Sequence, residues 1–324
     1  MSQFVLYLFD WKAFGKMTSW PWMKDVQEAV ANPIAPINEH DDRQSVKALL
    51  TEHGDKIEKI REGIKDDPLF DGRKHDDLWI LRFWLSHKKT KQAIAAAKST
   101  LELRNKYNLD SKDIRGETPH KTEEPRSKEY WEVRCRGDGI VCAVPDKQRG
   151  VICFIKFAQM NPEAAKLLSQ ETWDYAFIYN SEWTFQWLDY VTRTTGRLTK
   201  SVRLVDMSGL SLGHFDRAST KRDGKIMNEM EDMYPQLLDT LYGCYPPSFM
   251  HTIWSFLRPI MPKRIIDKID LVEPGTNKKE RDRLLKHISL EDLPVYFGGK
   301  NEVPPKDWDN LYPWKPTITD EIET

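Results

Sequence analysis

Apolar residues between about Asp41 and Asp110 recur at steps of three and four. This spacing places the apolar side chains along one face of successive helices. The recurring positions include Val46, Leu49, Leu50, Ile57, Ile60, Ile64, Leu78, Leu81 and Leu85. We therefore predict a small helical domain over residues 41–115. An N-terminal arm over residues 1–40 precedes it and ends in a linker interrupted by prolines.

The pattern changes from about Gly150. Short β-rich runs over residues 151–157, 201–206, 239–245 and 268–272 alternate with helical segments over 161–193 and about 222–238. Short apolar strands alternating with helices are typical of a mainly parallel sheet with helices packed against it. We predict an α/β fold, with this domain spanning residues 125–300 and a proline-rich, acidic tail over 301–324.

The most unusual segment is the predicted helix Ser248–Arg258, which is apolar on nearly every side and is stopped by Pro259. A soluble chain must bury such a helix, or use it to cover an apolar molecule that sometimes leaves. Four cations lie within or just after the helix: Arg258, Lys263, Arg264 and Lys268. Apolar insertion beside positive charge suits reversible binding to an anionic membrane surface, although a solvated charged edge is the alternative. The segment indicates a lipid-handling protein.

The amino-acid composition narrows the class of protein further. The chain of 324 residues has a formal net charge of −1, which argues against a bulk nucleic-acid binder. The four cysteines, Cys135, Cys142, Cys153 and Cys244, show no CxxC pair and no metal-ligand spacing. We expect reduced thiols in a cytoplasmic protein, with no metal and no cofactor. No apolar run is long enough for a membrane span, and we expect no signal peptide.

Two aromatic groups have two interpretations each. Trp11, Trp20 and Trp22 of the N-terminal arm, with nearby lysines, could lie at a membrane interface or pack on the chain's own domain. The second group lies along the predicted helix from Trp173 to Val191. Aromatic residues at helical spacing more often form a core than a ligand site, but part of this helix could line a cavity.

The segment Gly209-Leu-Ser-Leu-Gly213 matches the GxSxG pattern of a nucleophilic serine after a strand. Asp232 or Asp239 followed by His251 or His287 would complete the chain order of a hydrolase triad. No HGGG-like oxyanion segment lies upstream. The alternative is a turn in which Ser211 caps the residues that follow.

An ordered set of motifs resembles the Sec14-like (CRAL-TRIO) lipid-binding family over about residues 45–300. The motifs are Leu81-Arg-Phe-Trp-Leu-Ser-His-Lys-Lys89, Val205-Asp-Met-Ser-Gly-Leu-Ser211, Tyr234-Pro235, Tyr245-Pro246, the Trp254 helix, Lys268-Ile269 and Leu293-Pro-x-x-Phe-Gly-Gly299. The resemblance implies a bilobed α/β fold whose hydrophobic cavity holds one lipid beneath a helical gate. It also reassigns GxSxG to a structural turn.

Site residues follow from the same resemblance. The implied gate consists of Phe249, Ile253, Trp254, Phe256 and Leu257, with a membrane-facing hinge over residues 258–268. The implied lipid-contacting positions nearer the headgroup are Tyr175, Ser201, Arg203, Ile265 and Lys268.

The headgroup positions depart from the family's best-known patterns. Where inositol-lipid-binding members carry a basic residue, an acid and a threonine, this chain has His87, Gln236 and Ile265, and it keeps only Lys268. For phosphatidylcholine, Tyr175 and Ser201 match, but Arg203 replaces a threonine and Ile152 a tyrosine. An arginine there could pair with a phosphate or carboxylate, or could be a surface residue of a strand.

The sequence thus predicts a non-enzymatic protein that binds a phospholipid or related hydrophobic molecule with non-standard headgroup contacts and transfers or presents it between membranes. We expect a cytoplasmic monomer that touches membranes transiently, without nucleic acid. The alternative function is a lipid esterase using Ser211.

Overall fold

The computed structural model describes residues 20–24, 26, 42–117, 122–135, 141–146, 150–257, 259 and 263–302. For residues 141–146 it describes only the backbone, and the side chains of His251, Ile253, Phe256 and Leu257 also lie outside the description. Trp11 and Arg258 lie outside the described residues.

The helical unit contains α2 (Val46–Ile64), α3 (Asp77–His87) and α4 (Thr90–Lys106), followed by the short helix η2 (Leu109–Ser111). Local capping sets two of the starts. The Ser45 side chain accepts a hydrogen bond from the Ala48 amide, and the Asp76 side chain accepts one from the Trp79 amide. The apolar stripe predicted from the sequence is buried: Ile57, Ile60 and Ile64 are all at most 4% exposed.

The described residues form a sheet of five strands in the order β1-β2-β3-β4-β5. Their bounds are Val141–Asp146, Gly150–Lys156, Ser201–Asp206, Leu238–Cys244 and Ile269–Val272. The last four strands run parallel, so the predicted α/β fold with a mainly parallel sheet is confirmed. The antiparallel edge strand β1 was missed by the sequence analysis.

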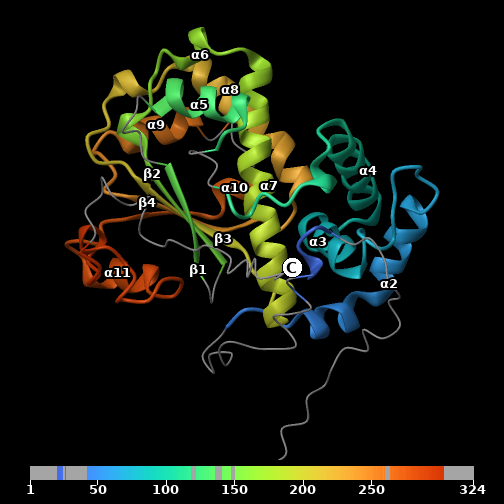
Figure 1. Ribbon diagram of the computed structural model, residues 1–324. Coiled ribbons are helices and arrows are strands. Elements are labelled where there is room, and N and C mark those ends of the chain that lie inside the picture. Colours follow the sequence, from blue (N-terminus) through green and yellow to red (C-terminus); the bar gives the residue numbers. More distant parts are fainter. Residues whose placement is uncertain are drawn as a thin grey trace, which may run out of the picture.

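Sequential order fixes where the connections lie. A parallel crossover is almost always right-handed, so successive crossovers in one direction lie on the same face of the sheet. On this face lie α6 (Ala164–Leu167), α7 (Gln170–Thr195), α8 (Arg217–Met233), α9 (Met250–Leu257) and α10 (Lys263–Ile266), with α5 (Pro125–Cys135) packed on α7 (Figure 1). Helix α11 (Lys278–Leu284) and the short helix η6 (Val295–Phe297) cover the opposite face.

Two predicted helix boundaries were wrong. The segment predicted as one helix over 161–193 is two, because the chain is extended at Leu168 and Ser169, and the Ser169 side chain caps the start of α7. The next helix spans 217–233 rather than 222–238, because Asp216 caps it early and Leu238 already belongs to β4.

The face of the sheet under α11 is a closed core. Side chains of β2 to β5 meet those of α11 and the segment after it. This cluster contains Ile152, Phe154, Val202, Leu204, Tyr242, Cys244, Val272, Leu284, Ile288, Leu293 and Phe297, all at most 5% exposed. No large apolar ligand has room here.

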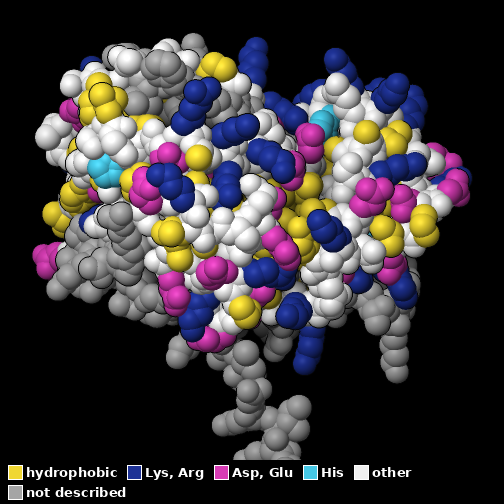
Figure 2. Space-filling model, turned by 90° about the horizontal axis from the view of Figure 1, so that it is seen from above, with side chains coloured by type: hydrophobic (Ala, Val, Ile, Leu, Met, Phe, Trp, Pro, Cys, Tyr) yellow, Lys and Arg dark blue, Asp and Glu magenta, His cyan; other side chains and the backbone are white. Residues whose placement is uncertain are grey.

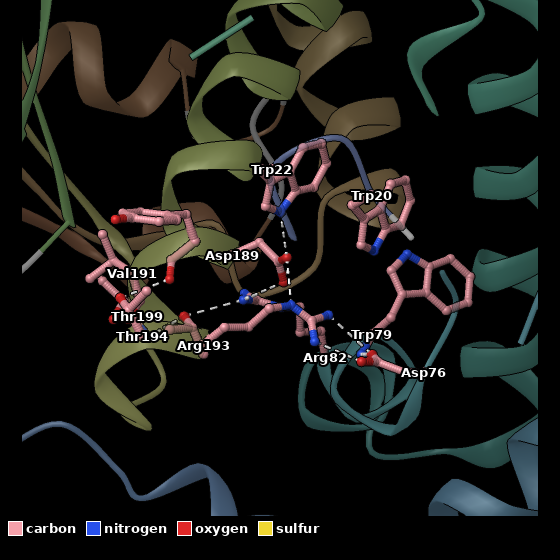
Figure 3. A network of polar contacts seen from close by, with 12 residues as sticks. Trp20, Trp22, Asp76, Trp79, Arg82, Asp189, Val191, Arg193, Thr194 and Thr199 are labelled. Atoms are coloured by element: carbon pink, nitrogen blue, oxygen red, sulfur yellow. Dashed lines mark hydrogen bonds and ion pairs between the residues drawn. The ribbon is translucent and has the colours of Figure 1, made fainter. Parts of the chain in front are cut away.

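The two described tryptophans of the N-terminal arm are buried. Trp20 and Trp22 stack at 5.1 Å between ring centroids and are at most 2% exposed. The indole of Trp22 donates a hydrogen bond of 2.9 Å to Asp189 of α7, within the polar network of Figure 3. These two side chains are therefore not available to a membrane interface.

One buried histidine of the helical unit makes the stability of the fold depend on pH. His75 is 1% exposed and packs on Trp79 at 4.6 Å between ring centroids. Its Nδ1 accepts a hydrogen bond from the Asp71 amide, which leaves Nε2 without a partner. Burial lowers the pKa of His75 from 6.5 to about 4.

We expect the chain to lose stability as pH falls from 6.5 toward 4, in part through His75. The unfolded chain binds a proton in this window and the folded chain does not, which amounts to at most about 3 kcal/mol. His75→Asn keeps an acceptor but does not titrate, so its unfolding free energy should depend less on pH than that of the native chain. Urea unfolding of both proteins at pH 7, 5.5 and 4.5 measures this difference, and parallel curves would contradict it.

Candidate functional site

The face of the sheet crossed by α9 and α10, here called the α9 face, is less completely covered than the opposite face. Strand register places Cys153, Arg203, Leu241 and Ile269 side by side across it. Cys153 is buried under α7, whereas the other three are half-buried, as is Leu271 in the next row. The α9 face of β3 to β5 therefore presents a largely apolar surface that the described side chains leave partly open.

Helix α9 starts at the carboxyl ends of the strands. Met250 is 4% exposed and packs with Leu210, and Phe249 lies against the same cluster, beside Met207 and Leu271. Gly243 permits this close packing, because a Cβ there would lie 2.7 Å from a methyl group of Leu271 and 2.8 Å from that of Met207. Since β5 runs parallel to β4, the segment from α9 to α10 must cross the α9 face from the carboxyl to the amino ends of the strands.

The far end of this crossover is held by Arg264 of α10. Its guanidinium contacts Glu231 at 2.7 Å and Asp232 at 3.1 Å, both on α8, and donates to the Ser86 carbonyl of α3 at 3.1 Å. Burial raises the pKa of Glu231, although Arg264 acts in the opposite direction. One side chain thus joins the base of the crossover to two helices of the surrounding frame.

The positions that the resemblance assigns to inositol-lipid recognition come together around Arg264. The Gln236 amide donates to Ser86 Oγ at 3.0 Å, and His87 Nε2 lies 3.8 Å from Asp232. Burial lowers the pKa of Lys268, whose ammonium group donates a hydrogen bond to the Leu238 carbonyl. Ile265 is half-buried beside them and offers no polar group. Internal contacts therefore already engage Gln236, Arg264 and Lys268 at this end of the crossover, here called the rim, whereas His87 Nε2 is buried without a hydrogen-bond partner.

The four cations predicted as one edge do not form a single free surface. Arg264 and Lys268 are held by the internal contacts just described, and Lys263 is exposed. At the end of the molecule where α6 lies, Lys and Arg side chains alternate with Asp and Glu (Figure 2). Neither observation marks a broad surface of one charge among the described residues.

The remaining predicted headgroup residues lie on α7 and β3. Ser201 is fully buried and donates its hydroxyl to the Leu237 carbonyl at 2.7 Å. The ring of Tyr175 lies 3.4 Å from the Arg126 guanidinium, and burial raises the pKa of its phenol. Arg203 is half-buried, and its Nε is buried without a hydrogen-bond partner.

The GxSxG segment forms a turn rather than a triad. Ser211 and His214 make a reciprocal cap, with Ser211 Oγ 2.9 Å from His214 Nδ1 and the Ser211 amide donating to the same nitrogen at 3.0 Å. Asp232 contacts Arg264, and Asp239 lies at the amino end of β4 beside His287 at 3.8 Å. Ser211 follows the carboxyl end of β3, so it lies at the opposite ends of the strands from Asp239. The predicted capping role is confirmed, and the structure does not bring Asp232, Asp239 or His287 to Ser211.

A small cavity with several charged lining residues lies elsewhere, at the amino ends of β2 to β4. Its volume is about 210 Å³, and Arg43, Lys200, Asp239 and His287 are among its lining residues. Sites for drug-sized ligands occupy roughly 300–1,000 Å³ and are mostly apolar. Its size and charge therefore do not suit a lipid.

The described part of the chain contains neither a candidate membrane-spanning helix nor a candidate metal site. None of its helices is long and apolar enough to cross a membrane. Its His, Cys, Asp and Glu side chains form no group of three or more that could hold a metal ion.

The roles of Ser86, Glu231 and Arg264 were missed by the sequence analysis because their partners are distant in the chain. Ser86 and Arg264 are separated by 178 positions, and Glu231 carried no motif that marked it as the partner of a later arginine. Only the pairing of α3, α8 and α10 in space reveals the contacts.

The fold and the α9 face together define a class of protein: a helical unit joined to a mainly parallel sheet, one face of which lies under an apolar helical crossover. Residues 137–299 match the family model described as CRAL/TRIO domain. The chain belongs to this family.

The chain is also similar to individual proteins. The chain is 23% identical over 260 residues to a SEC14 cytosolic factor of Eremothecium gossypii, covering 79% of each chain. It is 25% identical over 167 residues to a SEC14 cytosolic factor of Candida glabrata, which is 49% of this chain and about half, 52%, of that relative's length. A solved structure described as the crystal structure of Sfh5 aligns with a TM-score of 0.49 at 14% identity, covering 82% of this chain and 90% of the other.

Proposed function

We propose that the chain binds a single phospholipid or related hydrophobic molecule between the α9 face and the α9 crossover, and transfers or presents it between membranes. The observation that carries the proposal is the half-buried apolar surface of Leu241, Ile269 and Leu271 beneath an apolar helix. Membership of a family whose relatives include proteins described as cytosolic factors supports it, and the proposal includes a cytoplasmic location with peripheral membrane contact.

The energetics of transfer explain why such a surface needs a movable cover. Each CH₂ group exposed to water costs about 0.8 kcal/mol, so a lipid in transit must be enclosed. Release then requires a cover whose apolar side chains exchange protein contacts for bilayer contacts at little net cost. We assign this role to a gate formed by Phe249, Ile253, Trp254, Phe256 and Leu257, with residues 258–268 as its hinge.

We expect the purified full-length chain to retain one lipid-sized mass per molecule in native mass spectrometry and to move a fluorescent phospholipid between vesicles. Trp254→Ser should slow transfer several-fold, because the gate then inserts less apolar surface into the bilayer. Vesicle-to-vesicle fluorescence dequenching measures the rate, and thermal unfolding of the variant checks that the fold is kept.

Ser211→Ala is the matched control and also tests the alternative function. It removes a hydroxyl from an exposed turn that contributes no apolar surface to the proposed site, so transfer should be unchanged. The native chain should show no hydrolysis of short acyl esters for this variant to lose. Ester hydrolysis abolished by Ser211→Ala, without retained lipid or transfer, would replace the proposal with an esterase. Retention of phosphatidylinositol alone would refute the non-standard headgroup contacts.

A further inference from the structure

Arg203 is an exception among the described arginines of this chain. The other buried arginines of the described residues all contact a carboxylate: Arg82 with Asp189, Arg104 with Glu182, Arg115 with Asp113, Arg134 with Asp223, and Arg193 with Asp76 and Asp189. The described half-buried arginines other than Arg203 also make a side-chain hydrogen bond. Among the described residues, none makes a hydrogen bond or ion pair with the Arg203 guanidinium, and its Nε is buried.

An arrangement of this kind is costly without a partner. A guanidinium is always charged and carries five N–H donors in a planar fork. Partly removing it from water without an acceptor costs free energy that a paired carboxylate or phosphate would offset. The neighbours of Arg203 across the strands, Cys153 and Leu241, provide no such group.

The position of Arg203 faces the proposed ligand. It lies in the middle of β3 on the α9 face, in register with Leu241, which is followed by Ile269. A ligand lying along these apolar side chains would bring one end to the guanidinium. The rim differs, because the polar groups of Gln236, Arg264 and Lys268 are already engaged within the protein.

From this contrast we propose that the ligand is an anionic amphiphile whose carboxylate or phosphate pairs with Arg203 on the floor of the site, while its apolar chain lies under α9. The inference rests on the proposed function and specifies its ligand class. Bidentate pairing of a guanidinium with either anion would supply both affinity and orientation. The polar end of the ligand then binds at the sheet, through Arg203, rather than at the rim.

The test uses two pairs of radiolabelled probes, and the two members of each pair have the same hydrocarbon chains. Each probe is partitioned from phosphatidylcholine vesicles into the lipid-depleted full-length protein. Oleic acid against oleyl alcohol tests a carboxylate, and dioleoylphosphatidic acid against dioleoylglycerol tests a phosphate. The native chain should take up at least one acid tenfold more than its neutral counterpart. Arg203→Met should abolish this preference while uptake of the neutral probe persists, and Arg203→Lys should restore part of it. Lys225→Met removes an exposed cation of α8 and should change nothing.

The outcomes separate the inference from the proposed function. Equal uptake of acid and neutral probes by the native chain, or a preference that survives Arg203→Met, overturns the inference and leaves lipid binding intact. Failure of the native chain to take up any probe or phosphatidylcholine itself overturns the proposed function and the inference together. If Arg203→Met does not fold, thermal stabilisation of the native chain by each member of a pair decides: no larger shift for the acid contradicts the inference.

Discussion

Replacing Asp189 with alanine should destabilise the chain by about 3–5 kcal/mol, the cost of removing one partner from a buried ion pair. Asp189 is 1% exposed and lies on α7 facing the helical unit. Its carboxylate accepts hydrogen bonds from Arg193 at 2.7 Å and from Trp22 at 2.9 Å, and lies 3.7 Å from Arg82 (Figure 3).

The large effect follows from what remains after the substitution. Arg82 is 1% exposed and would keep only a hydrogen bond of 3.3 Å to Thr192. Arg193 would retain Asp76, but the two guanidinium groups would then face each other with one carboxylate fewer between them. Trp22 would also lose its acceptor, so the tryptophans of the N-terminal arm would be held less firmly.

Chemical unfolding of Asp189→Ala and of Glu163→Ala measures the difference. Glu163 forms a solvent-exposed pair with Lys166 on α6, and such pairs contribute at most about 1 kcal/mol. Similar losses in the two variants would show that the Asp189 network is not the strong link proposed between the arm, α3 and α7.

The second large effect is expected for Glu182→Gln, again about 3–5 kcal/mol. Glu182 of α7 is 1% exposed and binds the Arg104 guanidinium through two hydrogen bonds of 2.8 and 3.0 Å. Tyr234 donates to the same carboxylate at 2.9 Å. Burial alone would lower the pKa of Arg104, but Glu182 and Asp110 outweigh it and raise the pKa. The glutamine would leave this buried cation with Asp110 as the one carboxylate among the contacts described.

Glu229→Gln is the matched control for this prediction, because it makes the same chemical change in an exposed residue of α8. It should alter the unfolding free energy by no more than about 0.5 kcal/mol. Equal stability of Glu182→Gln and the native chain would mean that the Arg104 pair only offsets its own cost of burial.

Both networks stabilise the helices that surround the proposed gate, and in this way they bear on the proposed function. They join α3, α4 and α7 by charges buried on both sides, whereas the crossover is held at its base by the half-exposed Arg264. Exposed ion pairs are weaker than buried ones and are screened by salt. The helical unit and α7 therefore form the rigid part, and the α9–α10 crossover is the element that can open at lower cost.

Much of the fold was predictable because it depends on local pattern. Helical spacing over 41–115 and the alternation of strands and helices after Gly150 identified the helical unit and four of the strands. Strand β1 was missed: its six residues, Val141–Asp146, pair antiparallel with β2, and that pairing is a property of the sheet. The break before α7 was also missed, because the apolar pattern continues across Ser169.

Residue types at the candidate site were predictable, but their roles were not. Sequence analysis singled out Arg203, Lys268 and Ser211 from motifs. Only the contacts show that Lys268 donates to a backbone carbonyl, that Ser211 caps a turn, and that no described residue pairs with the Arg203 guanidinium.

The sequence by itself determined that this chain is an α/β protein of the CRAL/TRIO family with an apolar helix near its end, because periodicity and ordered motifs are written along the chain. The tertiary structure alone decided which charges are satisfied. Arg264 pairs with Glu231, 33 positions earlier in the chain, and Arg104 pairs with Glu182, 78 positions later. Whether a charged side chain is neutralised or left for a ligand depends on distances of a few ångströms that only folding sets.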